Sequence, residues 1–252
     1  MADILPECLI QKILCCLNFK EATKMTIISK TWLQAWLTLS NLKFTTYYLN
    51  RNMKIVDNIM ERYRDGKIPI QKFELSYFVH YNSDFFHLID KWLDIAFQNG
   101  VENLIFRVHV SRSYRWSIFK IMAAKSLREL VLSNCDLMYD SLSSGVAGNC
   151  SSLRKLSLSY IILNDNILQT LLNSCPLIVT FTLEYCSGLK KIELPNLQKI
   201  KSVSIRMNKN QRVKIETPTL EHLFFSGFED EYPMLDIIDA PNLVSLEYIG
   251  CL

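Results

Sequence analysis

The feature that most constrains this chain is a short apolar pattern that returns along its length. The pattern is apolar-x-x-apolar-x-apolar, as in Leu153-x-x-Leu156-x-Leu158. Further copies begin at residues 70, 101, 127, 178, 200, 220 and 243. From residue 101 onward the starts lie about 20–26 residues apart, a period typical of arrays that stack strand beside strand. One such unit cannot bury its apolar face alone, so the sequence predicts a stacked array.

Each copy also predicts which side chains face a partner. The first, fourth and sixth residues should point into the core, and the third, fifth and seventh toward a concave sheet face. The predicted concave-face residues are Asn103, Ile105, Arg107, Glu129, Val131, Ser133, Lys155, Ser157, Ser159, Thr180, Thr182, Glu184, Ser202, Ser204, Arg206, His222, Phe224 and Ser226. Arginine and aromatic residues dominate the energetics of interfaces. The candidate target-binding residues are Arg107, Lys155, Arg206, His222 and Phe224. Each of these five residues, taken singly, could equally be an ordinary solvent-exposed strand residue without a binding role.

The segments between the strands change along the chain. Residues 114–124 and 164–175 are predicted to be helical, the latter with four inward apolar residues, Ile167, Leu168, Leu171 and Leu172. After a strand-like copy at 189–194, prolines favour extended or turn connections. These prolines are Pro195, Pro218, Pro233 and Pro241.

Ahead of the array, the pattern predicts two helices flanking a strand. One helix covers 50–64 with Gly66 as its stop, and the other covers 83–99 with Asn82 or Ser83 as its cap and Gly100 as its stop. The strand between them covers 70–77.

The eight cysteines fit the repeats better than they fit chemistry. No C-x-x-C or H-x-x-x-H spacing occurs, and the N-terminus does not resemble a secretory signal, so neither a metal site nor a disulfide framework is predicted. The ninth position of a repeat satisfies backbone groups where the strand turns away. That position falls on Cys135, Cys186, Asn208 and Cys251. Cys150 and Cys175 recur at similar offsets, so these thiols are expected to be structural.

The N-terminal residues predict three short helices with apolar side chains to spare. Leu5-Pro6 opens the first, residues 19–29 carry the second, and residues 30–44 carry the third. A unit of this size supplies a core of only a few kcal/mol. Some of its apolar side chains are therefore expected to contact a partner.

This segment resembles the F-box motif of plant F-box/leucine-rich-repeat (FBD-related) proteins. The resemblance rests on Leu5-Pro6, Ile13-Leu14, Leu17, Ser29-Lys30, Trp32 and Trp36. It implies docking onto the Skp adaptor and, through it, a cullin. The adaptor-facing residues it implies are Leu5, Pro6, Leu9, Ile13, Leu14, Ile28 and Trp32. Some of these must instead pack inside the F-box, and a generic helical bundle is the alternative reading.

Composition and motifs argue against the main competing classes. The net charge of +3 is too small to indicate nucleic-acid or membrane binding, and no apolar run approaches the roughly 18 residues that span a bilayer. Phosphate loops and hydrolase motifs do not occur, and we expect neither enzyme activity nor a cofactor. The acidic run Glu229-Asp230-Glu231 is more simply a solvated loop than a carboxylate pair.

Charge is distributed unevenly along the later repeats. Residues 190–214 are mostly basic, and all the charged residues of 216–239 are acidic. Either adjacent repeats attract each other, or the basic stretch binds a phosphorylated or acidic partner.

Together these observations predict an α/β chain: a three-helix F-box followed by a curved leucine-rich-repeat solenoid with a parallel β-sheet on the concave face. The expected divisions are 3–45 for the F-box, 46–100 for a helical linker and first repeat, and 101–252 for repeats that lack a C-terminal cap. The function expected is that of an intracellular (nuclear or cytoplasmic) substrate receptor of an SCF-type ubiquitin ligase. The alternative is a repeat scaffold or truncated copy without ligase function.

Overall fold

The structure is a computed structural model that describes residues 5–17, 19–45, 53–78, 86–109, 114–139, 149–195, 197–207, 211–227 and 234–249. Several predictions fall outside these residues: the caps Asn82 and Ser83, the ninth-position residues Asn208 and Cys251, Pro233 and the acidic run 229–231. The chain forms two compact units, 1–105 and 106–252.

The first unit begins with three helices around a small core. They are α1 (Glu7–Cys16), α2 (Phe19–Met25) and α3 (Lys30–Leu37). The core consists of Ile10, Leu14, Ala22, Trp32, Ala35 and Leu39. Ser29 caps α3 by accepting a hydrogen bond from the backbone N–H of Trp32 at 3.4 Å, which satisfies one of the free donors at the helix start. The predicted three helices are confirmed.

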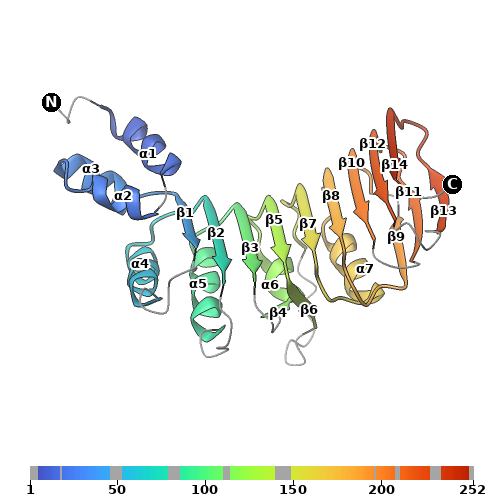
Figure 1. The fold of residues 1–252 in the computed structure, drawn as a ribbon, viewed down its shortest axis with the longest axis horizontal. Coiled ribbons are helices and arrows are strands. Elements are labelled where there is room, and N and C mark those ends of the chain that lie inside the picture. The colour runs from blue at the N-terminus through green and yellow to red at the C-terminus, as the bar shows by residue number, and fades with distance from the viewer. Residues whose placement is uncertain are drawn as a thin grey trace. The chain divides into compact units, whose positions relative to one another are not determined.

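The remainder of the first unit alternates strands and helices (Figure 1). Its elements are β1 (Asn41–Thr45), α4 (Met53–Gly66), β2 (Lys72–Tyr77), α5 (Phe86–Gln98) and β3 (Asn103–Val108), in which the boundary between the units falls. The strands follow the order β1-β2-β3, and β1 pairs in parallel with β2. The helices and strand predicted here are confirmed in kind. The strand β1 is a correction, because residues 41–44 were assigned to the third helical segment.

The alternation in β1 explains that correction. Leu42 and Phe44 are buried while Lys43 and Thr45 are exposed, a period of two that a strand requires. Its neighbour β2 buries Phe73, and the rings of Phe44 and Phe73 meet edge to face at 6.0 Å. A strand pattern with only two apolar residues, Leu42 and Phe44, is too short to be distinguished from the end of a helix by sequence alone.

The second unit carries the predicted repeats. Its main strands are β5 (Glu129–Ser133), β7 (Lys155–Ser159), β8 (Thr180–Glu184), β10 (Ser202–Arg206), β12 (His222–Ser226) and β14 (Ser245–Ile249). They lie in this order, and each pairs in parallel with the next without a shift in register. Every strand starts two residues after the start of a predicted copy, which confirms the repeat.

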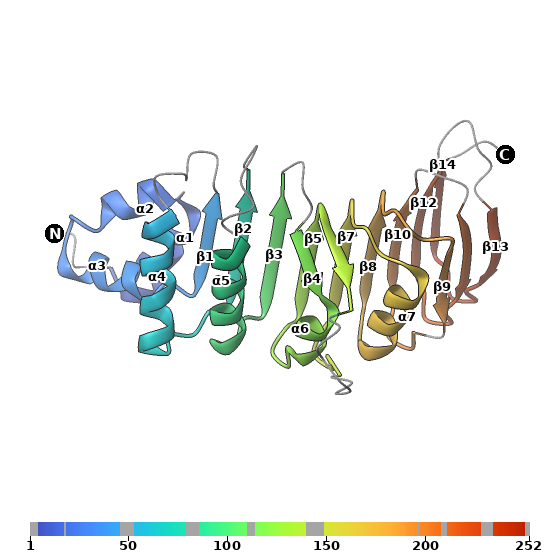
Figure 2. The ribbon, with the colours of Figure 1, turned by 90° about the horizontal axis from the view of Figure 1, so that it is seen from below.

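The other side of this sheet carries the connecting segments (Figure 2). They are β4 (Tyr114–Ser117), α6 (Ile118–Ala123), β6 (Cys135–Met138), α7 (Asp165–Ser174), β9 (Lys191–Pro195), β11 (Arg212–Glu216) and β13 (Met234–Asp239). The strands β9, β11 and β13 form a small parallel sheet. Gln169 of α7 donates a hydrogen bond to the carbonyl of Glu193 in β9 at 2.7 Å, which joins the helix to that sheet.

These segments confirm two predictions and correct a third. The inward stripe of α7 is buried as expected. The strands β9 and β11 are extended, as the strand-like copy at 189–194 and the prolines after it indicated. Residues 114–117, predicted as helix, form β4 instead. Tyr114 and Trp116 are buried and both contact the ring of Phe106, with centroids 5.0 and 5.5 Å away. This packing of alternate aromatic side chains outweighs the weak helical pattern.

Candidate functional site

Several apolar side chains of the F-box are exposed. Together they are defined here as the F-box surface, which consists of Leu5, Pro6, Leu9, Ile13, Ile27, Ile28 and Leu33. In α1 the exposed Leu9 and Ile13 are four residues apart, and so are the buried Ile10 and Leu14. The helix is thus apolar on two faces, and only one of them is used by the core.

The structure divides the residues that the F-box resemblance implies. Leu5, Leu9, Ile13 and Ile28 are exposed by 40%, 42%, 38% and 41%, and Pro6 is exposed as well. Leu14 and Trp32 are buried in the F-box core at 1% and 5%. These two side chains therefore hold the helices together, while the other five lie on the F-box surface.

Sequence reasoning missed Ile27, which is the most exposed large apolar residue described, at 87%. It lies in the turn between α2 and α3, where Ile28 donates a backbone hydrogen bond to Met25 at 3.1 Å. The available signal was an isoleucine that directly precedes Ile28 and lies outside the predicted helical stripe of Ala22, Met25 and Ile28. A turn that carries two isoleucines adds to the unpartnered apolar area of the F-box surface.

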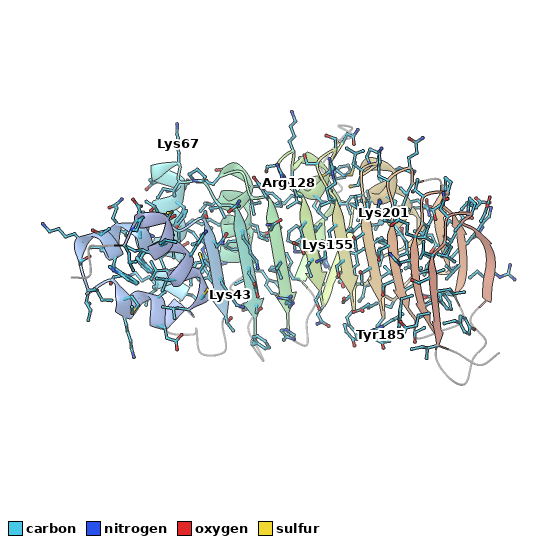
Figure 3. The ribbon with its side chains drawn as sticks, turned by 90° about the horizontal axis from the view of Figure 1, so that it is seen from above. Lys43, Lys67, Arg128, Lys155, Tyr185 and Lys201 are labelled. Atoms are coloured by element: carbon cyan, nitrogen blue, oxygen red, sulfur yellow. The ribbon has the colours of Figure 1, made fainter. Side chains whose placement is uncertain are left out.

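The second surface is the sheet face of the second unit that no helix covers, defined here as the open face. In β5, β7, β8, β10 and β12 the second and fourth residues are buried and the first, third and fifth are not. Figure 3 looks onto this face and shows Lys155 on it, with Tyr185 at the carboxyl end of β8. The open face is therefore built from the residues predicted to line it. Ile105 of β3 is an exception, because it is 8% exposed and counts as core.

A chain of polar contacts crosses the open face. Ser159 donates to the Glu184 carboxylate at 3.2 Å, and Arg206 Nη1 lies 3.4 Å from the other carboxylate oxygen. The guanidinium carbon of Arg206 lies 4.9 Å from the ring centroid of Phe224. The parallel register places these residues on neighbouring strands. The contacts place Arg206 between the Glu184 carboxylate and the Phe224 ring.

The other three candidate residues lie apart from that chain of contacts. Lys155 pairs with Glu129 at 2.7 Å and its side chain remains 49% exposed. His222 Nδ1 lies 2.9 Å from the Ser245 hydroxyl. Arg107 lies in β3 and is half-buried.

Some of the basic residues in the stretch 190–214 pair with nearby carboxylates. Lys201 pairs with Glu221 of the next repeat at 2.8 Å, and Lys214 pairs with Glu216 at 2.7 Å. Lys191 pairs with Glu193. Pairing across repeats supports the reading in which neighbouring repeats attract each other.

Backbone strain marks the carboxyl edge of the open face. Tyr160 and Tyr185 follow β7 and β8 with φ of 56° and 53°, in the left-handed region that bulky residues seldom adopt. Each donates its backbone N–H to the next strand, to Glu184 and Arg206 respectively, at 2.8 Å. Their rings lie 5.2 Å apart. The hydrogen bonds and the ring contact offset the strain and place two aromatic side chains at this edge.

The repeat cysteines serve the core. Cys186 donates to the carbonyl of Leu158 at 3.5 Å, and Cys150 donates to that of Ala124 at 3.3 Å. Burial raises the pKa of the Cys186 thiol to about 12. A hydrogen bond with Cys150 and burial raise the pKa of Cys175 as well. Such thiols stay protonated, in keeping with the predicted structural role.

The described residues contain neither a cluster of metal ligands nor a membrane-spanning helix. Among the residues that the structure describes, no three His, Cys, Asp or Glu side chains gather as a metal site needs. Within the same residues, no helix is long and apolar enough to cross a membrane.

Comparison with known proteins agrees with this architecture. A family model described as "At1g61320/AtMIF1, LRR domain" matches residues 59–247, and an F-box domain model matches residues 3–44. The relatives include the F-box/FBD/LRR-repeat protein At1g13570 of Arabidopsis thaliana, 27% identical over 77% of this chain and 46% of that protein. The F-box/LRR-repeat protein At3g03360 of the same plant is 24% identical over 92% of this chain and 48% of that protein.

A helical F-box followed by parallel repeat strands defines an F-box/leucine-rich-repeat protein, which confirms the resemblance and the fold class. Since the repeat match takes in more than half of the residues, the chain belongs to the At1g61320/AtMIF1 leucine-rich-repeat family. The chain spans about half the length of the curated relatives it matches.

Proposed function

We propose that this protein brings a target protein to an SCF-type ubiquitin ligase. The F-box surface docks the Skp adaptor, which connects the chain to a cullin, and the open face holds the target. The protein then acts without chemistry of its own, inside the cell, in the nucleus or cytoplasm. It raises the effective concentration of the target near the conjugating enzyme.

The observation that carries the proposal is the unused apolar face of the F-box. Leu9 and Ile13 are about 40% exposed on a helix that already supplies Ile10 and Leu14 to the core. Exposed apolar side chains that gather in one patch are typical of a protein interface. Leu5, Pro6 and Ile28 are exposed as well, so these five residues are the proposed adaptor contacts.

The open face supplies the second half of the proposal. Arg206 and Phe224 contact each other on this face, and arginine and aromatic side chains are the residue types that contribute most to interfaces. Lys155, His222 and Arg107 are the remaining proposed target contacts. An array of parallel strands presents such side chains in rows, which suits an extended protein surface.

The test is a pull-down of Skp adaptor and cullin with the intact chain and with Ile13→Asp. Ile13 lies outside the F-box core, so a carboxylate there should remove adaptor binding without unfolding the helices. Ile55→Asp is the matched control, since Ile55 is also an exposed isoleucine, at 48%, and lies on α4 outside the F-box.

Retention of adaptor and cullin by the intact chain and by Ile55→Asp, with loss in Ile13→Asp, is the expected result. Failure of the intact chain to retain the adaptor would contradict the proposal and leave a repeat scaffold without ligase function. Equal retention of adaptor and cullin by all three proteins would show that the adaptor does not bind through Ile13 of the F-box surface.

A further inference from the structure

The first unit contains a cavity that the proposed function does not use. Its volume is about 200 Å³, and it lies where the F-box helices meet α4, β1 and β2. One part of its wall is apolar and includes Leu14, Leu17, Trp36 and Ile59. A cavity of this size holds a small molecule of about ten non-hydrogen atoms, well below the size of a nucleotide.

Arg62 of α4 lines this cavity with an incompletely satisfied guanidinium. The guanidinium carbon lies 5.2 Å from the Trp36 ring centroid and 5.4 Å from that of Tyr63. The Nε atom is buried and has no hydrogen-bond partner, and no carboxylate among the described residues pairs with this side chain. Aromatic faces offset part of the charge but accept no strong hydrogen bond. A half-buried guanidinium whose Nε atom lacks a partner favours an anion beside it.

Two lysines add positive charge to the same cavity. Lys43 of β1 and Lys72 of β2 line it and lie 3.3 and 3.5 Å from the Glu74 carboxylate. Glu74 is the only carboxylate in the described lining, so three cations face one anion there. One negative charge from a ligand would bring the cavity closer to neutrality.

Tyr63 completes the polar wall, and its side chain also forms a hydrogen bond with Arg62. Its hydroxyl donates to the carbonyl of Leu39 at 2.7 Å, which commits the phenol proton to the protein. Burial raises the pKa of Tyr63 to about 12, so the ring stays neutral beside Arg62. The phenol therefore does not supply the negative charge that Arg62 lacks.

We propose that this cavity binds a small organic anion that has one carboxylate on an apolar body. The carboxylate accepts hydrogen bonds from Arg62 and is attracted by Lys43 and Lys72, while the body packs against the apolar wall. Because the wall comes both from the F-box helices and from β1, α4 and β2, the bound molecule contacts both parts of this unit. The inference does not rest on the proposed ligase function.

The probe is benzoate, added to the full 252-residue chain and followed by calorimetry and by ¹⁵N chemical-shift changes. Benzamide keeps the body and removes the charge, and inorganic phosphate keeps the charge and removes the body. Saturable one-to-one binding of benzoate in the millimolar range or tighter is expected, with at least about tenfold weaker binding of the other two probes. Equal binding of benzamide or phosphate, or no saturable binding of benzoate, overturns the proposal.

Variants locate the site. Arg62→Gln should weaken benzoate binding about tenfold or more, because it removes the charge-assisted hydrogen bonds. Lys67→Gln is the matched control, an exposed cation of the same unit outside the cavity lining, and should bind as the parent does. If circular dichroism shows that Arg62→Gln does not fold, Lys43→Gln/Lys72→Gln replaces it, since both lysines are substantially exposed. Unchanged affinity in the variant that folds overturns the assignment.

Discussion

Arg206 stacks on Phe224, with its guanidinium carbon 4.9 Å from the ring centroid, while the same guanidinium pairs with Glu184 on its other side. In the parallel register Arg206 is directly opposite Glu184, whereas Phe224 is opposite Ser204. The arginine thus reaches diagonally across the sheet to the ring. The repeat makes this arrangement possible, because it brings residues about 20 positions apart side by side in neighbouring strands.

The Arg206–Phe224 contact should be weak in stability terms. Replacing Arg206 by Ala is expected to lower the free energy of unfolding by about 1 kcal/mol or less, since partly exposed ion pairs and cation–π contacts contribute little. Urea unfolding of Arg206→Ala, Phe224→Ala and the double variant gives their coupling energy, expected near 0.5 kcal/mol. A coupling energy indistinguishable from zero would show that the stacked geometry does not persist in solution.

Gly188 should tolerate no side chain. Its φ is +86°, and a Cβ at this position would lie 2.6 Å from the carbonyl oxygen of Leu163. Gly188→Ala is expected to lower the free energy of unfolding by about 2–4 kcal/mol, the sum of left-handed strain and a backbone clash.

Gly100 provides the control for that substitution. It also has positive φ, +78°, but nothing lies within 4 Å of the Cβ position. Gly100→Ala should therefore cost only the conformational part, about 1 kcal/mol. Equal losses for the two alanine variants in thermal or urea unfolding would mean that the approach of Gly188 to Leu163 is relaxed in solution.

The sequence predicted the repeat strands almost to the residue because one face of each strand is buried and the pattern has a strict period. It predicted the secondary structure less well where weak helix and strand preferences compete. Residues 114–117 form a strand because Tyr114 and Trp116 pack on Phe106, a contact that depends on tertiary structure. The division of the F-box residues also required coordinates, because Ile13 and Leu14 are chemically alike and only helix packing buries one of them. The cavity around Arg62 could not be predicted at all, since its lining comes from segments separated by tens of residues.

Asp57 should link α4 to α5 in a way that depends on pH. Its carboxylate accepts hydrogen bonds at 3.0 Å from the indole N–H of the buried Trp92 and from Lys91. Burial opposes ionisation, but these two bonds prevail and lower the pKa of Asp57 below its ordinary value of 3.8. The stabilisation is therefore complete above the unfolded-state pKa and is lost as the pH falls through the folded-state pKa.

Substitutions separate the charge of Asp57 from its role as an acceptor. Asp57→Ala leaves the Trp92 donor buried without a partner and should cost about 1–3 kcal/mol in unfolding free energy at neutral pH. Asp57→Asn can still accept from Trp92, so it should cost less. The asparagine variant should also lose less stability than the parent when acidified to about pH 3. Identical acid profiles for parent and Asp57→Asn would contradict the linkage.

The contribution of Cys186 to stability should depend on pH in the opposite direction. Burial raises the pKa of its thiol from an ordinary 9.0 to about 12, so the folded chain holds this proton more tightly than the unfolded chain does. The contribution to stability is complete below the unfolded-state pKa and disappears as the pH rises toward the folded-state pKa. Urea unfolding under reducing conditions should therefore show stability falling between about pH 8 and about pH 10.5.

Replacement of Cys186 by Ala tests which thiol carries this effect. The variant should be less stable than the parent at pH 8, because the substitution leaves a small cavity. Its stability should nevertheless fall less steeply with rising pH. The two slopes should differ by up to about 1.4 kcal/mol per pH unit. Some dependence should remain, since burial also raises the pKa of Cys135. If the stability of Cys186→Ala and that of the parent fall equally with rising pH, the Cys186 thiol is accessible to water. The ninth position of this repeat is then not buried in solution.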